Sequence, residues 1–147
     1  MNSLLRFRPS LLRCARMMSD EINTILLPYQ LNYSLWQILF VIQEKHGCTS
    51  IEMADYLNVS KPSIAKRIHV LMQMGVLSQI ETEDKRQKKL MLSDQGIALF
   101  QQCAAEIDNF ERQLIQNLDQ QDIQRSIKIL HAIINDLEIN KTGEQHE

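Results

Sequence analysis

Hydroxyl and cationic side chains gather on one side of a helix that is predicted to begin after Ser60. Serine is a common N-cap residue, and Pro62 falls in the first turn, where its missing amide proton costs little. Ile64, Ile68 and Leu71 recur at helical spacing and predict the buried face. The polar side chains off that face are Lys61, Ser63, Lys66 and Arg67. Donors of these types bind phosphate oxygens and base edges, and the positive end of the helix dipole attracts phosphate near Ser60.

A second basic segment follows at a predicted β-hairpin. Strand patterns over residues 76–80 and 89–92 flank a polar tip, residues 81–88. The basic side chains of this segment are Lys85, Arg86, Lys88 and Lys89. Arginine at a hairpin tip is suited to the minor groove of DNA, whose negative potential attracts it. Each basic segment by itself is also typical of a solvated surface or a polar turn, so the prediction depends on their order along the chain.

The elements that must position these side chains have clear local signals. Thr49 and Glu52 match a capping box that begins a short helix, and Asn58 and Val59 form the turn before Ser60. A short helix, a tight turn, a second helix and a hairpin make a winged helix-turn-helix. In such a unit the second helix enters the major groove of DNA.

Long helices are predicted on both sides of this unit. One runs from about residue 11 to Leu27 and stops at Pro28, another runs from a Ser34 cap to Gly47, and Asp119 caps the last one. The stripe predicted to be buried on the second of these helices is Leu35, Ile38, Leu39 and Ile42. A helix predicted after Ser93 has apolar residues on one side, namely Ile97, Phe100, Ala104, Ile107 and Leu114. In the last helix, Ile123, Leu130 and Leu137 repeat every seven residues, and Ile127 and Ile134 repeat beside them. The seven-residue repeat in the last helix indicates packing against another helix, such as one from a second subunit. With only 4 Gly and 3 Pro, the chain has few breaks, which argues against an all-β barrel.

Charge is distributed unevenly along the 147 residues. The 16 Lys and Arg against 18 Asp and Glu give a net charge of −2, and that total argues against a nucleic-acid binder. By segment, residues 61–89 carry +4, whereas residues 19–60 carry −4 and residues 90–147 carry −6. Outside the N-terminal residues, the predicted helix and hairpin therefore form the one basic zone. That distribution is expected of a DNA-binding face on an acidic body.

The first 18 residues allow two interpretations. They contain four Arg and no acidic residue, which is typical of a mitochondrial transit peptide. Their apolar residues, however, stay in phase with the helical pattern that continues through Ile22, Ile25 and Leu26. A cleavable leader has no reason to keep that phase, so we favour a helix of the folded protein.

Several other classes of site find no support in the sequence. Cys14, Cys48 and Cys103 are odd in number and far apart, which predicts three reduced thiols rather than a disulfide framework or a zinc site. The histidines are scattered, and no phosphate-binding glycine loop or nucleophile motif is present. The longest apolar run, residues 38–42, is too short for a membrane helix. We therefore expect a cytoplasmic protein that has no enzymatic activity, cofactor or metal.

Two motifs resemble a known family. Asp84-Lys85-Arg86, followed by the segment from Leu90 to Gly96, is similar to the wing signature D-x-R-x-x-x-(L/V)-x-L-(T/S)-x-x-G. This signature belongs to the multiple-antibiotic-resistance regulator (MarR) family of bacterial repressors. Residues 53–60 and 68–75 resemble the same family's helix-turn-helix, and the likeness extends from about residue 11 to residue 137. The recognition helix departs from the pattern at Ala65, where a small hydroxyl residue is common.

The resemblance implies a homodimer that binds double-stranded DNA. Residues 1–32 would form an N-terminal dimerisation helix, residues 33–92 the winged helix-turn-helix and residues 93–147 the C-terminal dimerisation helices, in a fold that is mainly α with a small β-hairpin. By the family's pattern, Arg86 would enter the minor groove and Asp84 would hold it by a salt bridge. The full set of expected DNA-binding residues is Ser60, Lys61, Pro62, Ser63, Lys66, Arg67, Lys85, Arg86 and Lys88.

The resemblance also implies a repressor that an effector releases from a pseudo-palindromic operator. For a small aromatic carboxylate, we expect a cleft to which Arg13 and Arg16 contribute the cations and Tyr33 and Trp36 the rings. The alternatives are an oxidant-sensing repressor that uses Cys14, flanked by Arg13 and close to Arg16, and a winged-helix protein-interaction module without DNA binding. Salt dependence separates the last alternative from a DNA-binding protein.

Overall fold

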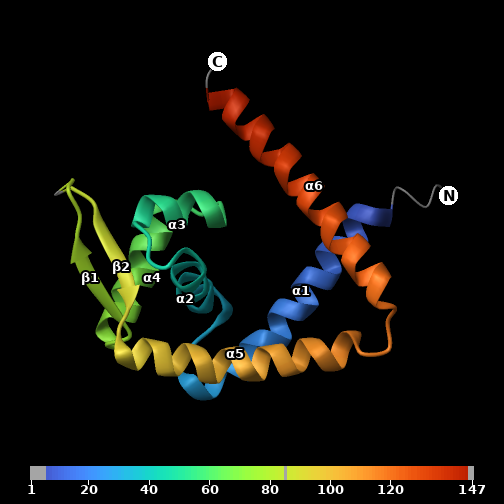
Figure 1. The fold of residues 1–147 in the computed structure, drawn as a ribbon, viewed down its shortest axis with the longest axis horizontal. Helices are drawn as coiled ribbons and strands as arrows, with labels where there is room; N and C mark the ends of the chain where they lie inside the picture. The colour runs from blue at the N-terminus through green and yellow to red at the C-terminus, as the bar shows by residue number, and fades with distance from the viewer. Residues whose placement is uncertain (1–5, 85, 146–147) are drawn as a thin grey trace. The chain divides into compact units, whose positions relative to one another are not determined.

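The computed structural model describes residues 6–84 and 86–145. Within them the element order is α1 (Phe7–Leu26), η2 (Leu27–Tyr29), α2 (Tyr33–Lys45), α3 (Ser50–Leu57), α4 (Lys61–Gln73), β1 (Leu77–Glu81), β2 (Lys88–Leu92), α5 (Asp94–Ile115) and α6 (Gln120–Gln145) (Figure 1). This confirms the expected class, which is mainly α with one hairpin. The chain packs as two compact units, one ending at Asp108 and the other beginning at Asn109, so that the division falls inside α5. The three-part division expected from the sequence stays a prediction.

The ends of α1 and α2 follow from local chemistry. α1 ends at Leu26, and Pro28 lies in the 3-10 turn that follows, as its missing amide proton requires. α2 begins two residues earlier than expected because Asn32, rather than Ser34, is the N-cap: its Oδ1 accepts a hydrogen bond from the Leu35 amide at 2.8 Å. The helix ends through two consecutive left-handed residues, His46 (φ 54°) and Gly47 (φ 102°), and only the second is a glycine.

The capping box predicted for α3 is present. The Thr49 hydroxyl accepts a hydrogen bond from the Glu52 amide at 3.2 Å, and a Glu52 carboxylate oxygen accepts one from the Thr49 amide at 3.0 Å. The second of these bonds lowers the pKa of Glu52 because it stabilises the ionised carboxylate. Asn58 adopts the left-handed conformation (φ 54°) that turns the chain into α4.

β1 and β2 pair antiparallel, with Leu77 opposite Leu92 and Glu81 opposite Lys88. The pairing extends each predicted strand by one residue toward the tip. Backbone hydrogen bonds in both directions also join Cys48 to Leu90, at 3.1 and 2.8 Å. The middle of β2 is therefore attached to the loop between α2 and α3.

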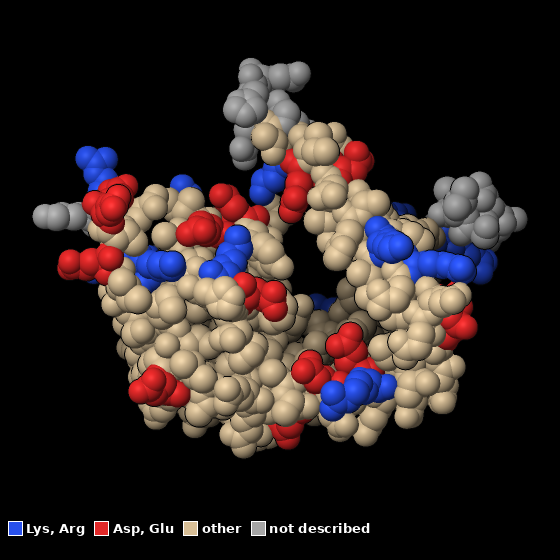
Figure 2. Space-filling view, in the orientation of Figure 1, with Lys and Arg blue, Asp and Glu red and all other residues tan. Residues whose placement is uncertain are grey.

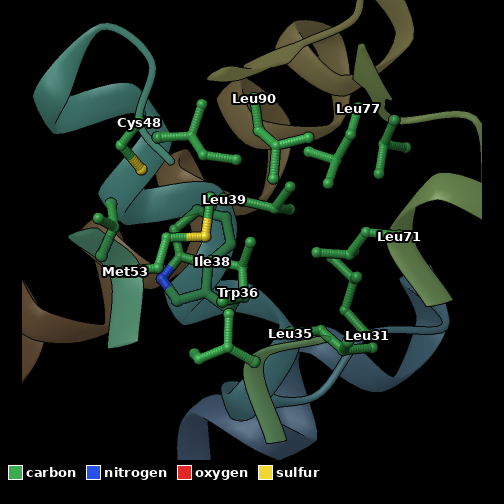
Figure 3. Close-up of a cluster of buried hydrophobic side chains, with 14 of the residues drawn as sticks. Leu31, Leu35, Trp36, Ile38, Leu39, Cys48, Met53, Leu71, Leu77 and Leu90 are labelled. Atoms are coloured by element: carbon green, nitrogen blue, oxygen red, sulfur yellow. The ribbon is translucent and has the colours of Figure 1, made fainter. Parts of the chain in front are cut away.

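The hydrophobic core lies around α2. The predicted stripe on this helix is confirmed, since Leu35, Ile38, Leu39 and Ile42 are all buried. Figure 3 shows side chains of α3, α4 and the hairpin, namely Met53, Leu71, Leu77 and Leu90, gathered with those of α2 in one cluster. Trp36 is also buried in this core, 6% exposed, and its ring stacks on Phe100 of α5 with centroids 4.9 Å apart. α2 is thus the element against which the rest of the helix-turn-helix packs.

The start of α5 is joined closely to the end of α4. The Ser93 hydroxyl accepts a hydrogen bond from the Gly96 amide at 3.1 Å and lies 2.7 Å from the Gly75 carbonyl, to which it donates. A Cβ at Gly96 would collide with the Val76 carbonyl, so only glycine allows this approach. Two of the apolar residues predicted to share one side of α5, Ile97 and Leu114, are 41% and 52% exposed. Ile97 lies beside the stripe that Gly96 and Cys103 define, and Leu114 lies beyond the end of the first unit.

In the second unit, α6 begins as predicted. The Asp119 carboxylate accepts hydrogen bonds from the amides of Gln121 and Asp122 at 2.7 and 3.2 Å. The apolar repeat of this helix is largely exposed in the single chain: the side chains that exceed one third exposure include Ile127, Leu130, Ile134 and Leu137.

Candidate nucleic-acid interface

The first turn of α4 presents polar groups to solvent. Ser60 is the N-cap, and its hydroxyl accepts a hydrogen bond from the Ser63 amide at 3.3 Å. Lys61, Pro62, Ser63 and Lys66 are all exposed, whereas Ile64 and Leu71 on the opposite side are completely buried. Ile68, also predicted to be buried, is half-buried. This side of α4 therefore combines a solvent-exposed helix N-terminus with the two lysines and two hydroxyl side chains predicted from the sequence.

Arg67 lies elsewhere than expected. It is half-buried, and its Nη1 donates hydrogen bonds to Oε1 of Gln37 at 3.2 Å and to the Ser34 carbonyl oxygen at 3.4 Å. Both acceptors belong to α2. Arg67 is on the same helix as the other predicted residues, but its guanidinium points toward the body of the protein. Sequence spacing missed this because Arg67 lies at the border between the apolar and polar sides of α4.

The hairpin tip is held by short-range hydrogen bonds. The Asp84 carboxylate accepts one from the Arg86 amide at 3.0 Å, and the Thr82 hydroxyl lies 2.7 and 2.6 Å from the carbonyl oxygens of Asp84 and Gln87. The expected salt bridge between Asp84 and Arg86 is not among the ion pairs of the described residues. An aspartate at a tight turn reaches the amide two residues on, and that contact orients the carboxylate toward the backbone. Arg86 and Lys88 are exposed; Lys85, another predicted contact, lies outside the described residues.

An open hollow of about 450 Å³ lies between α4, the hairpin and the start of α3. Apolar side chains on its walls include Ile51, Ile68, Met72 and Leu90, and the cations are Arg86 and Lys88. His69 and Gln79 also line it, and neither was predicted from the sequence. His69 follows Ile68 on the helix and Gln79 lies on β1, so their common hollow depends on the hairpin folding toward α4.

The charge of this region is mixed rather than uniformly positive. Figure 2 shows acidic and basic side chains side by side around the hairpin tip, at the upper left of the view. The acidic residues of the tip are Glu81, Glu83 and Asp84. Attraction of a polyanion therefore depends on the orientation of individual side chains as well as on net charge.

The residues expected to form an aromatic-acid cleft are not brought together. Trp36 belongs to the core, and Tyr33 is half-buried at the start of α2, where its amide donates to Asn23 Oδ1 at 2.7 Å. Arg13 is exposed on α1, and Arg16 is paired with Asp20 of its own helix at 3.4 Å, with both side chains mostly in solvent. Trp36 packs against Phe100 within the single chain, and the cleft expected from the sequence stays a prediction.

The cysteines differ sharply in accessibility. Cys14 is exposed, whereas Cys48 and Cys103 are fully buried. Burial raises the pKa of each buried thiol to about 11, because the thiolate loses its hydration. Only Cys14 has the access that reaction with an oxidant requires.

We expect one cysteine of the native chain to react with a thiol reagent at about pH 8, and all three after unfolding. The buried thiols have a raised pKa, so they stay protonated below about pH 11 and gain thiolate only above it. Mass spectrometry of the alkylated native protein checks this result. Modification of Cys48 or Cys103 as fast as Cys14 would contradict it.

Other kinds of site are missing from the described part of the chain. Nowhere in it do three or more His, Cys, Asp or Glu side chains group closely enough to hold a metal ion. No single described helix has both the length and the apolar composition of a membrane span; α1 with η2 and α2 meets these criteria only as a pair bent by 86°.

The helix-turn-helix, its hairpin and the flanking helices define a winged-helix fold. A model of the MarR family matches residues 29–87. The helix-turn-helix-type transcriptional regulator YwoH of Bacillus subtilis, itself uncharacterised, is 27% identical over 108 residues, which cover 74% of this chain and 79% of YwoH. The match covers the predicted helix-turn-helix and agrees with the resemblance of its motifs to this family. Its relatives are described as regulators and not as enzymes.

Solved structures show the same fold. A Staphylococcus aureus MarR protein in complex with salicylate and kanamycin is 24% identical, covers 90% of this chain and 91% of its own, and has a TM-score of 0.81. S. aureus MepR in a complex with DNA is 14% identical, covers 92% and 99%, and has a TM-score of 0.79. At these low identities the likeness shows a shared fold, that is, the same arrangement of helices and strands.

Proposed function

We propose that this protein is a dimeric repressor of the MarR family, which binds double-stranded DNA with α4 in the major groove and the hairpin tip in the minor groove. The observation that carries the proposal is the exposed start of α4, where the side chains of Ser60, Lys61, Ser63 and Lys66 lie at the positive end of the helix dipole. Arg86 and Lys88 extend the contact from the hairpin. The DNA complex of MepR, which has the same fold, supports this use of the elements. A regulator of chromosomal DNA would work in the cytoplasm.

The proposed homodimer is supported by exposed apolar side chains at the two ends of the chain. Phe7, Leu12 and Met17 of α1 are at least 46% exposed, and the repeat of α6 is exposed as well. Burying such residues against a second copy removes apolar area from water. Two α4 helices related by a two-fold axis, about one helical turn of DNA apart, require a pseudo-palindromic operator.

Selection of bound sequences from a random DNA pool tests the proposal. We expect enrichment of an inverted repeat, and an affinity that falls steeply as salt rises because phosphate contacts release counterions. A pool without enrichment, together with no salt-dependent binding, would reject DNA binding and favour a protein-interaction module.

The effector that we propose is a small aromatic carboxylate, bound in the hollow between α4 and the hairpin. Its volume of about 450 Å³ is within the range of ligand sites, and it combines apolar walls with Arg86 and Lys88 as partners for an acid. A ligand there would occupy the two cations that the proposed DNA contact needs, so binding would be competitive with DNA. The salicylate complex of the S. aureus MarR protein supports this chemical class.

Salicylate, with benzyl alcohol as a neutral control of similar size, tests this effector. We expect calorimetry without DNA to detect salicylate binding only, weakened about tenfold or more by Arg86→Ala because the charge-assisted bond is lost. Arg16→Ala, in the cleft expected from the sequence, is the matched control and should leave binding unchanged. The opposite response of the two variants would place the ligand on α1 instead.

The exposure of Cys14 supports one alternative, release by an oxidant. Peroxide would then release DNA from the unmodified protein and leave the Cys14→Ser variant bound. Release from both would exclude Cys14 as the sensor.

A further inference from the structure

Arg67 of α4 contacts α2, whereas the residues proposed to bind DNA point to solvent. Arg67 is in the middle of the recognition helix α4, yet its Nη1 donates to Gln37 Oε1 at 3.2 Å and to the Ser34 carbonyl at 3.4 Å. Hydrogen bonds from a charged donor are stronger than neutral ones, and this pair is partly shielded from water. The guanidinium therefore connects α4 to α2 across the interior of the helix-turn-helix.

We propose that Arg67 is a positioning residue, which sets the orientation of α4 for DNA through Gln37 and Ser34 instead of contacting DNA itself. This inference rests on the proposed DNA-binding function. It replaces the expectation from sequence spacing that Arg67 faces the major groove.

The packing of α4 shows why such a contact is needed. The two completely buried side chains of this helix, Ile64 and Leu71, are seven residues apart and lie in one line along it. Ile68 and Met72, both half-buried, pack on the side of this line away from Arg67. Apolar contacts are not directional, so they resist a small rotation of the helix only weakly. Arg67 is three residues after Ile64 and lies to one side of the line, where a hydrogen bond resists rotation. A rotation of about 10° moves a side chain at the surface of a helix by about 1 Å, comparable with the tolerance of a specific site.

The two acceptors, Gln37 and the Ser34 carbonyl, lie on a helix whose position is fixed by core packing. Gln37 lies between Trp36 and Ile38 on α2, which are 6% and 0% exposed. Trp36 stacks on Phe100 with the two rings 6° from parallel, so the backbone that carries Gln37 is held by the core and by α5. Figure 3 shows Leu35, Trp36 and Ile38 in the cluster that also receives Leu71 of α4. Arg67 thus holds the recognition helix against the most deeply buried helix of the protein.

Operator binding by Arg67→Met, Gln37→Leu and the double variant tests the inference. We expect each single variant to lower operator affinity, Arg67→Met about tenfold and Gln37→Leu somewhat less because the Ser34 carbonyl remains. The double variant should bind no more weakly than Arg67→Met, since both changes remove one interaction. Gln37→Glu, which keeps an acceptor for Arg67, should retain the affinity.

The salt dependence of binding separates positioning from direct contact. A lysine or arginine that touches phosphate contributes about 1 to the slope of log affinity against log salt. We expect Arg67→Met and Gln37→Leu to leave that slope, and the affinity for non-specific DNA, unchanged. Lys66→Met is the matched control on the same helix: it should reduce the slope and show no coupling to Gln37→Leu.

A reduced slope for Arg67→Met, with full operator affinity for Gln37→Leu, would overturn the inference in favour of a phosphate contact. Additive effects in the double variant would overturn it as well. Circular dichroism verifies folding. If Arg67→Met does not fold, the operator affinities of Gln37→Leu and Gln37→Glu test the inference, since both variants keep Arg67. Absence of salt-dependent operator binding in the unmodified protein would instead reject the proposed function, before any variant is compared.

Discussion

Replacement of Trp36 by alanine is expected to lower the free energy of unfolding by about 3–5 kcal/mol, the range for truncating a large aromatic side chain in a core. Trp36 is 6% exposed and loses its stacked partner Phe100 when the ring is removed. The cavity would open beside the buried residues of α2, where the chain has little freedom to collapse. Urea unfolding followed by circular dichroism measures the change, because Trp36 is the only tryptophan and its fluorescence is lost with it.

Two variants make this result specific. Trp36→Phe keeps an aromatic ring for Phe100 and should cost clearly less than alanine. Arg16→Ala removes an exposed side chain whose ion pair with Asp20 is worth little, so stability should not change. A Trp36→Ala protein of normal stability that no longer responds to aromatic acids would show that Trp36 lines a ligand cleft after all.

Arg86→Ala is expected to weaken operator binding by about 1–3 kcal/mol, or roughly 5- to 150-fold, and to leave the oligomeric state unchanged. Arg86 is exposed at the hairpin tip and is not one of the apolar side chains of α1 and α6 that the proposed dimer uses. Fluorescence anisotropy at fixed salt measures the affinity, and sedimentation measures the mass. Unaltered binding, or a protein that dissociates into monomers, would contradict the role given to this arginine.

The Asp84 contact gives this experiment its control. The carboxylate accepts from the Arg86 amide, so Asp84→Asn keeps an oxygen acceptor and should retain most of the affinity. Asp84→Ala removes the acceptor and should loosen the tip, with a loss of binding smaller than that of Arg86→Ala. If Asp84→Asn were as damaging as Arg86→Ala, the carboxylate charge itself would be needed, as the family pattern implies.

The elements could be predicted because their signals are local. The capping box at Thr49 and Glu52, the caps at Ser60 and Asp119 and the left-handed turn at Asn58 each involve residues within a few positions of one another. Such short-range hydrogen bonds form in nearly any protein that contains the pattern. One cap was assigned wrongly, at Ser34, because Asn32 is an equally good acceptor two residues earlier.

The directions of particular side chains could not be predicted in the same way. Arg67 and Trp36 have chemistry that suits a DNA contact or a ligand cleft, and periodicity gave no sign of their partners. Those partners, Gln37 and Phe100, are far away in the sequence and meet them only after the helices pack. The hollow lined by His69 and Gln79 was missed for the same reason. Residue type indicated what each group can bind, whereas tertiary packing determined what it touches.

If the proposed dimer forms through the exposed apolar repeat of α6, the amount of protein in the cell becomes a variable of regulation. Ile127, Leu130, Ile134 and Leu137 are exposed within one chain. A dimer held by these side chains would dissociate on dilution, because association depends on the protein concentration. Below the dissociation constant of the dimer, the concentration of DNA-binding species rises with the square of the total concentration. A twofold change in expression would then change operator occupancy by up to about fourfold. In the proposed dimer, the helix face that pairs two subunits would thus set a threshold copy number, below which the operator stays free without any effector.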